Sequence, residues 1–343
     1  MGIIIAILLI GFVIFFHELG HFVLAKANGI RVDEFSLGLG PTLVGKKIGG
    51  TLFSLKLLPF GGACMMGEDD ADDRSEGSFN SKSVWARISV IAAGPVFNLI
   101  LAWIFCVILI SVSGYRTAEL TDVPAGYSAQ EEGLKAGDVI TEINGRKVHF
   151  WDDISLYTLT HPDETSYEIT YERSGETYTV RLEPRMLEGD AAPMLGVIGG
   201  EMEYPGISGS MQYGFYKLQY WMTYTVDSLR MLVTGQVGLR DMSGPVGMAA
   251  VADEVYRTAA PAGVLAVVLS LMNFGTLLSA NLGVMNLLPI PALDGGRLLF
   301  LFVEAVRRRR VPPEKEGMVH FAGFALLMTF MVVILFNDII KLF

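Results

Sequence analysis

Four long stretches of this 343-residue chain are nearly free of charged side chains, and this pattern limits the fold more than any other feature. They cover residues 2–24, 88–112, 262–290 and 318–336. A helix needs about 20 apolar residues to cross the hydrocarbon core of a bilayer. Only 18% of the residues are charged and the mean hydropathy is +0.44, which leaves too little polar surface for a soluble protein of this size. The sequence predicts a polytopic α-helical membrane protein with four transmembrane helices.

The first and third of these stretches have features beyond their apolar character. The apolar run Ile3–Phe16 is similar to a signal peptide, but no basic residue precedes it and no small-residue cleavage site follows. We therefore expect it to be kept as the first span. In the third stretch, Gly275, Gly283 and the pair Pro289/Pro291 predict an interrupted helix.

Basic residues predict the orientation in the membrane. They gather in the loop 26–86 and in the loop between the third and fourth spans, which contains the run Arg307–Arg310. The positive-inside rule places both loops in the cytoplasm, and the segment 113–261 and both termini outside. The net charge of −10 argues against a nucleic-acid partner.

The segment between the second and third spans has a different character. Apolar residues alternate in 167–171 and 178–182 around Ser174-Gly175, and 138–143 leads into Asn144-Gly145; both patterns are typical of β-hairpins. We predict a small water-soluble β-rich domain at 117–186. The segment 205–260 follows as a linker, with a helix at 211–232 suited to the membrane interface. A membrane domain at 1–112, carrying a membrane-associated β-hairpin within 30–62, and another at 262–343 complete the predicted organisation.

The pattern His17-Glu18-Leu19-Gly20-His21 carries the chemistry. Residues four apart lie on one face of a helix, so both imidazoles can reach one zinc ion. Glu18 stands where it can take a proton from a water molecule activated by the metal. Because three such side chains are costly inside a span, this HExxH pattern predicts a zinc hydrolase site.

A catalytic zinc ion commonly has three protein ligands. His149 and His161 fall in the β-rich insert and His320 opens the fourth span, so all three are poor candidates. Asp294 is the better one, because a carboxylate there follows an apolar span and is held between prolines and glycines. A polar turn that caps the third span is the alternative reading of Asp294.

Two asparagines lie within the apolar spans. Hydrogen bonds in helix packing are the default explanation for Asn98 and Asn286. For Asn286, contact with the backbone of a substrate beside the metal is the functional alternative, since an unfolded peptide at this depth needs hydrogen-bond partners.

Several motifs in order over nearly the whole chain resemble the site-2 protease family of intramembrane metalloproteases. After His17–His21 come Gly94-Pro95-x-x-Asn98, a PDZ-like segment with Gly133–Asp138, then Ser243-Gly244-Pro245 and Asn286-x-x-Pro289-x-Pro291-x-Leu293-Asp294-Gly295. The closest likeness is to the bacterial group that cleaves membrane-anchored anti-sigma factors and signal-peptide remnants.

This resemblance implies a zinc endopeptidase of the bacterial cell membrane that cuts single-span membrane proteins in or near the bilayer. His17, His21 and Asp294 would bind Zn²⁺, Glu18 would be the general base and Asn286 would contact substrate. The segment from Gly38 to Gly62 would form a hairpin that pairs with an extended substrate. The PDZ-like domain would lie outside the cytoplasm, and membrane lipid would surround the spans.

Two other functions fit parts of the pattern. An inactive membrane scaffold with a PDZ-like peptide-binding module would not need the intact set of His17, Glu18 and Asp294. A zinc transporter would place His and Asp at membrane depth, but it would be expected to show internal repeats, and the sequence has none.

Overall fold

A computed structural model describes residues 2–67, 73, 75–190, 192–238 and 242–341. By their internal contacts the residues form two compact units, Met1–Phe105 with Leu232–Phe343, and Cys106–Met231. The longer helices are α1 (Gly2–Ala27), α2 (Val84–Ser113), α5 (Ile207–Val233), α6 (Pro245–Ala259), α7 (Val264–Leu287), α8 (Asp294–Arg307) and α9 (Pro313–Lys341). Two short 3₁₀ segments, Phe79–Ser81 and Ala260–Ala262, precede α2 and α7.

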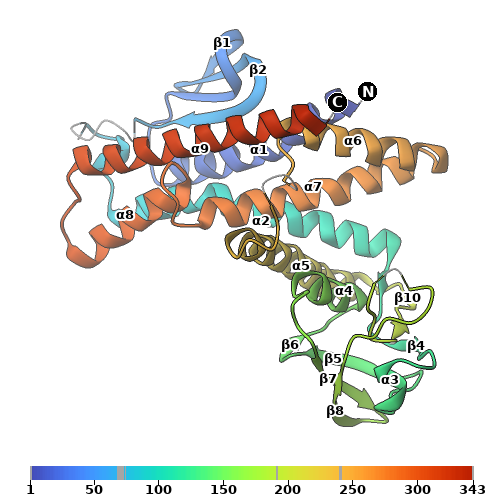
Figure 1. The fold of residues 1–343 in the computed structure, drawn as a ribbon. Coiled ribbons are helices and arrows are strands. Elements are labelled where there is room, and N and C mark those ends of the chain that lie inside the picture. Colours follow the sequence, from blue (N-terminus) through green and yellow to red (C-terminus); the bar gives the residue numbers. More distant parts are fainter. Residues whose placement is uncertain (1, 68–72, 74, 191, 239–241, 342–343) are drawn as a thin grey trace. The chain divides into compact units, whose positions relative to one another are not determined.

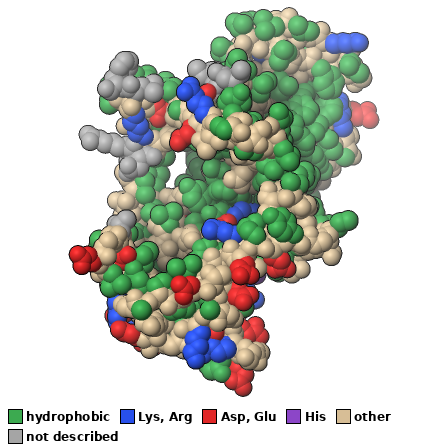
Figure 2. Space-filling view, turned by 90° about the vertical axis from the view of Figure 1, so that its right-hand side faces the viewer, with side chains coloured by type: hydrophobic (Ala, Val, Ile, Leu, Met, Phe, Trp, Pro, Cys, Tyr) green, Lys and Arg blue, Asp and Glu red, His purple; other side chains and the backbone are tan. Residues whose placement is uncertain are grey.

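Four helices of the described chain are long and apolar enough to cross a membrane, as the sequence predicts. These segments are Ile4–Ala27, Val84–Ser113, Val264–Leu287 and Glu314–Lys341. The most apolar window of the last one has none of its residues buried inside the structure. In Figure 2 hydrophobic side chains dominate the surface of the helices, whereas acidic and basic ones are spread over the β-rich part. An apolar surface of this extent is typical of helices that span a membrane.

The helix of the third span ends just before the predicted proline pair, but it is not interrupted at the two predicted glycines. α7 runs unbroken through Gly275 and Gly283, and it ends at Leu287, before Pro289. The expectation that these glycines break the helix is wrong, because they serve close packing. A β-carbon at Gly283 would lie 2.8 Å from Cδ2 of Leu99, and one at Gly275 would lie 3.1 Å from Cδ1 of Leu9. Small residues let neighbouring helices approach where lipid supplies no hydrophobic driving force.

The hairpin of the first unit is longer than the sequence suggests. β1 (Glu34–Ile48) and β2 (Thr51–Met65) meet at Gly49-Gly50, both with positive φ. Residues 44–48 pair with 51–55, and residues 34–37 pair with both 52–55 and 62–65. Phe35 and Phe53 make edge-to-face contacts with Phe22 of α1, which fixes the base of the hairpin to the first span.

Both ends of the span series pack on α6. Ala6, near the start of α1, joins a buried cluster with Ala252 of α6 and Phe274 of α7. Asp338, near the end of α9, accepts hydrogen bonds from the backbone N–H of Gly244 (3.0 Å) and Gly247 (2.8 Å) at the start of α6. The beginning of α1 and the end of α9 therefore lie at the same end of this unit (Figure 1), as an even number of spans requires.

The second unit is the β-rich module with α5. Its main sheet has the order β6-β5-β7-β8, and the two predicted hairpins are present, with Asn144-Gly145 and Ser174-Gly175 at positive φ. Its strands and short helices are β3 (Tyr115–Arg116), β4 (Leu120–Asp122), α3 (Ser128–Glu131), β5 (Val139–Ile143), β6 (Arg146–Lys147), α4 (Trp151–Thr160), β7 (Tyr167–Arg173), β8 (Glu176–Leu182), β9 (Ile198–Gly199) and β10 (Met202–Glu203). β9 and β10 pair with β4 and β3, so residues up to 203 complete the module.

Alternating apolar residues supply the core of the module. Ile140, Ile143, Ile169 and Leu182 are almost fully buried in it. Two ion pairs attach α5: Lys217 Nζ lies 2.7 Å from Asp152, and Arg146 Nη1 lies 2.7 Å from Asp227. α5 is not among the helices of the described chain that are apolar enough to span a membrane.

Candidate metal centre

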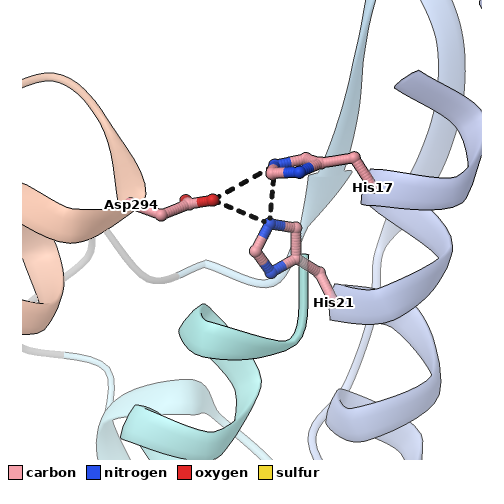
Figure 3. A group of neighbouring side chains, drawn as sticks. All are labelled: His17, His21 and Asp294. Atoms are coloured by element: carbon pink, nitrogen blue, oxygen red, sulfur yellow. Dashed lines mark hydrogen bonds and ion pairs between the residues drawn. The ribbon is translucent and has the colours of Figure 1, made fainter. Parts of the chain in front are cut away.

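α1 brings the two histidines of the HExxH pattern together. His17 and His21 are both buried, and their Nε2 atoms lie 3.2 Å apart. The rings are nearly perpendicular, so one nitrogen of each points to the same place (Figure 3). This is the arrangement that the i, i+4 spacing predicts.

Asp294 completes the group from the first residue of α8 (Figure 3). Its Oδ2 lies 3.1 Å from Nε2 of His17 and 3.4 Å from Nε2 of His21. These three residues form a group that could hold a metal ion. Sequence reasoning chose Asp294 over the other histidines, and the structure places His149 and His161 in the module, stacked on Tyr216 and Tyr157.

The donor set fits zinc. Ligand nitrogen and oxygen atoms lie about 2.0–2.2 Å from a tetrahedral zinc ion, which puts them roughly 3.3 Å from one another. The observed separations of 3.1, 3.2 and 3.4 Å agree with this value. Two imidazoles and one carboxylate are also ligands that a catalytic zinc ion commonly has, with a remaining position for water or substrate.

The loop before Asp294 is tightly constrained. Ala292 has a positive φ of 74°, and its backbone N–H donates a 3.0 Å hydrogen bond to Nδ1 of His320 in α9. A β-carbon at Gly295 would lie 2.0 Å from the carbonyl oxygen of Leu288, so this position accepts only glycine. His320, a poor ligand candidate in the sequence, therefore helps to position the loop that presents Asp294.

The outer nitrogens of both imidazoles are also engaged. Nδ1 of His21 lies 2.9 Å from the carbonyl oxygen of Val90, which favours a proton on Nδ1 and leaves Nε2 able to bind a metal ion. Nδ1 of His17 lies 3.1 Å from the side-chain amide of Asn98. The Oδ1 atom of Asn98 has no hydrogen-bond partner among the described residues. Turning this amide by half a rotation would let Oδ1 accept the Nδ1 proton of His17 and fix the same tautomer.

Asn98 makes the hydrogen bond between packed helices that is its default explanation, and its partner on α1 is the candidate metal ligand His17. Its backbone carbonyl accepts a 2.8 Å hydrogen bond from Ser279 Oγ of α7, but its side chain faces the candidate metal ligand. In the sequence, the indication of a special role for Asn98 was its position as a strongly polar residue within an apolar span. The pairing with His17, 81 positions away, needs the tertiary structure.

Glycines set the distance between α1 and α2 beside the two histidines. A β-carbon at Gly20 would lie 2.4 Å from the carbonyl oxygen of Ala93. One at Gly94 would lie 2.3 Å from Nε2 of His21 and 2.8 Å from Cε1 of His17. The two helices therefore cross at glycines, and α2 forms the wall against which both imidazoles rest.

Glu18 and Asn286 are the remaining predicted site residues. Glu18 follows His17 on α1, and a β-carbon at Gly62 of β2 would lie 2.9 Å from its Cγ. The edge segment 62–65 of the hairpin therefore runs beside Glu18. Asn286 is buried near the end of α7, and its side chain has no hydrogen-bond partner within the described part of the chain.

Comparisons with known proteins assign the family. The profile of peptidase family M50 matches residues 5–330. The chain belongs to peptidase family M50. It is similar to the zinc metalloprotease RasP of Geobacillus kaustophilus, with 34% identity over 98% of this chain and 97% of that protein. It is also similar to the regulator of sigma-W protease RasP of Bacillus subtilis, with 32% identity over 98% of each chain.

Two further similarities were found. A protein of Clostridium acetobutylicum is 38% identical over 99% of this chain and 97% of its own length. Among solved structures, the PDZ domain of the SdrC-like protein from Listeria monocytogenes matches 24% of this chain and 86% of that domain, with 21% identity and a TM-score of 0.21.

Family membership confirms the main functional prediction. This protein is a zinc metalloprotease, its cofactor is zinc, and its four apolar helices make it a multi-pass membrane protein. The resemblance to the site-2 proteases, inferred from the order of the motifs, is correct.

Proposed function

We propose that this M50 protease is an intramembrane endopeptidase that cleaves single-span membrane proteins, such as anti-sigma factors or signal-peptide remnants, in or near the bilayer. The observation that carries the proposal is the cluster of His17, His21 and Asp294, whose donor atoms lie 3.1–3.4 Å apart. The two histidines lie on the candidate span α1 and Asp294 lies at the start of α8. A B. subtilis relative with the name regulator of sigma-W protease supports the substrate class.

In this proposal His17, His21 and Asp294 hold the zinc ion. Zinc, when bound, supplies a Lewis acid that activates water near neutral pH and polarises the carbonyl of the scissile bond. Val90 and Asn98 hold the two imidazoles in the tautomer that leaves Nε2 as the ligand atom. Glu18 accepts the proton of the attacking water and returns it to the leaving amine, which requires a carboxylate next to the first ligand.

The hairpin and Asn286 are proposed to present the substrate. A transmembrane helix must unfold before its carbonyl can be attacked, and the freed backbone groups then need hydrogen-bond partners. Residues 62–65 form an edge of the β1–β2 sheet beside Glu18, so an extended substrate could add to this edge as a further strand. The side chain of Asn286, which has no hydrogen-bond partner among the described residues, would offer one more hydrogen bond to the substrate.

We also propose the orientation given by the loop charges. The loop 26–86, which contains the β1–β2 hairpin, and the loop between the third and fourth spans would face the cytoplasm. The β-rich module would lie outside, where a peptide-binding role in substrate selection is the natural assignment.

Glu18→Gln tests the catalytic proposal. The amide keeps the shape of the side chain and removes its basicity, so zinc content and thermal stability stay near the wild-type values. Cleavage of a panel of single-span proteins by the purified enzyme falls about a hundredfold or more, the scale of a lost general base.

The controls separate protease from scaffold. Uncut substrate should accumulate on the Glu18→Gln protein, because binding does not need proton transfer. Equal cleavage by wild type and variant would remove Glu18 from the mechanism. If wild type binds zinc but cuts none of many single-span proteins, the inactive scaffold becomes the better description.

A further inference from the structure

A basic cavity of about 650 Å³ lies between the start of α2 and the end of α8. Four basic side chains and one acidic side chain line it, which leaves an excess of three positive charges: Lys82, Arg87, Arg308, Arg310 and Glu304. A second cavity of about 360 Å³, which also contains Arg297 and Glu316, adjoins it and shares Asn80, Arg87, Glu304 and Arg310. The zinc ligands line neither cavity.

Basic side chains outnumber acidic ones among the described residues that line this cavity. Arg87 is buried and forms a double ion pair with Glu304, at 3.1 Å and 2.5 Å. Arg310 uses the same carboxylate at 3.7 Å and donates a 2.7 Å hydrogen bond to Asn80. Lys82 and Arg308 make no ion pair within the described part of the chain. Glu304 is thus the one carboxylate among the described residues that line this cavity, and Glu316 lines the adjoining one.

A buried donor in this group also lacks an acceptor. Nε of Arg87 has no hydrogen-bond partner among the described residues, although the side chain is only 6% exposed. An unsatisfied donor on a buried cation is costly, and an anionic oxygen in the cavity would relieve the cost.

The surroundings of the cavity match the surface of a bilayer. α2 and α9 are candidate spans; α2 begins beside this cavity and α9 begins beside the adjoining one. The first N–H groups of the 30-residue α2 favour a negative charge at this end. Trp85, on the rim of the cavity, is 66% exposed, and tryptophan is enriched at the level of lipid headgroups.

We propose that the basic cavity binds the phosphate group of an anionic phospholipid. Basic pockets between membrane helices bind such headgroups, and a phosphodiester offers oxygens to several cations at once. Free phosphate shares the headgroup chemistry, but the exposed Trp85 and the adjoining span ends favour a lipid. Arg308 directly follows α8, whose first residue is Asp294, so a bound headgroup would also hold the C-terminal end of this helix.

Native mass spectrometry of the full-length, delipidated protein tests the proposal. The probes are dioctanoyl-phosphatidylglycerol and, at equal concentration, dioctanoyl-phosphatidylcholine. The double variant Lys82→Gln/Arg308→Gln removes two cavity charges and leaves the Arg87–Glu304 pair intact. Binding of phosphatidylglycerol should weaken about twentyfold to thirtyfold, from the usual contribution of each basic residue near an anionic lipid surface.

The matched control is Lys46→Gln/Lys47→Gln, which removes the same charge from exposed residues of the hairpin. It should leave phosphatidylglycerol binding unchanged. Equal retention of the two lipids, or equal loss in both double variants, would overturn the site. Displacement of phosphatidylglycerol by inorganic phosphate at the same concentration would show that the site serves a soluble anion and would overturn the lipid assignment.

Discussion

Gly94→Ala is the sharpest test of the metal centre. The added β-carbon would lie 2.3 Å from Nε2 and 2.6 Å from Cε1 of His21, and 2.8 Å from Cε1 of His17. Carbon and nitrogen atoms in contact need about 3.4 Å or more, so α2 or the imidazoles must move by about 1 Å. A metal site tolerates ligand displacements of only about 0.2 Å.

The expected result is a large loss of zinc affinity in a folded protein. Altering groups that merely support a ligand costs about tenfold to a hundredfold in affinity. This change displaces two proposed ligands, so we expect a loss of at least about a hundredfold. Chelator competition on the purified enzyme measures the zinc dissociation constant, and cleavage of a single-span substrate should fall in parallel. Circular dichroism and thermal unfolding check that the fold persists.

Two glycine variants serve as controls. Gly11→Ala is also in a span, where the new β-carbon meets nothing within 4 Å, so zinc affinity should stay at the wild-type value. Gly283→Ala disturbs helix packing at Leu99 without touching the imidazoles, and it should lower stability more than zinc affinity. Wild-type zinc affinity in folded Gly94→Ala would refute the placement of the histidines against α2.

Three further predictions concern other parts of the molecule. Asn98→Ala should weaken zinc binding about tenfold to a hundredfold by releasing the ring of His17, and an unchanged chelator titration would contradict this. Single cysteines at Lys46 and Arg309 should react with membrane-impermeant reagents only from the cytoplasmic side and one at Glu176 only from outside; labelling of position 176 from the cytoplasm would reverse the orientation. Burial raises the pKa of Asp153 in α4 to about 6, against the lowering effect of its hydrogen bonds from the backbone of His149 and Phe150. The folded state therefore binds this proton more tightly than the unfolded state does, and the stability that comes from this binding is lost as the pH rises through about 6. The unfolding temperature of full-length Asp153→Asn should therefore rise relative to that of wild type between about pH 4 and 7. A pH-independent difference would contradict the raised pKa.

The sequence by itself determined the features that depend on neighbours along the chain. Apolar runs of spanning length predicted the four long helices, because a helix in lipid must satisfy its own backbone and present an apolar surface. Asn144-Gly145 and Ser174-Gly175 predicted their hairpins, since both turns need positive φ at adjacent residues. The spacing of His17 and His21 likewise predicted a shared donor site, because a single helical turn separates them.

The tertiary structure decided what depends on contacts between distant segments. Gly275 and Gly283 suggest a broken helix in the sequence, but the close approach of Leu9 and Leu99 shows that they are packing positions. Asp294 was a candidate from its local pattern alone, whereas its 3.1 Å distance from His17 depends on the loop that joins α7 and α8.

The hydrogen bonds that hold the two imidazoles in place also depend on the tertiary structure. A hydrogen bond to the carbonyl of Val90 or to Asn98 has no signature in a local pattern, because any residue offers a carbonyl and an asparagine in a span has several possible partners. The crossing of α1 and α2 at Gly20 and Gly94 selects these partners, and that crossing is set by the packing of whole helices.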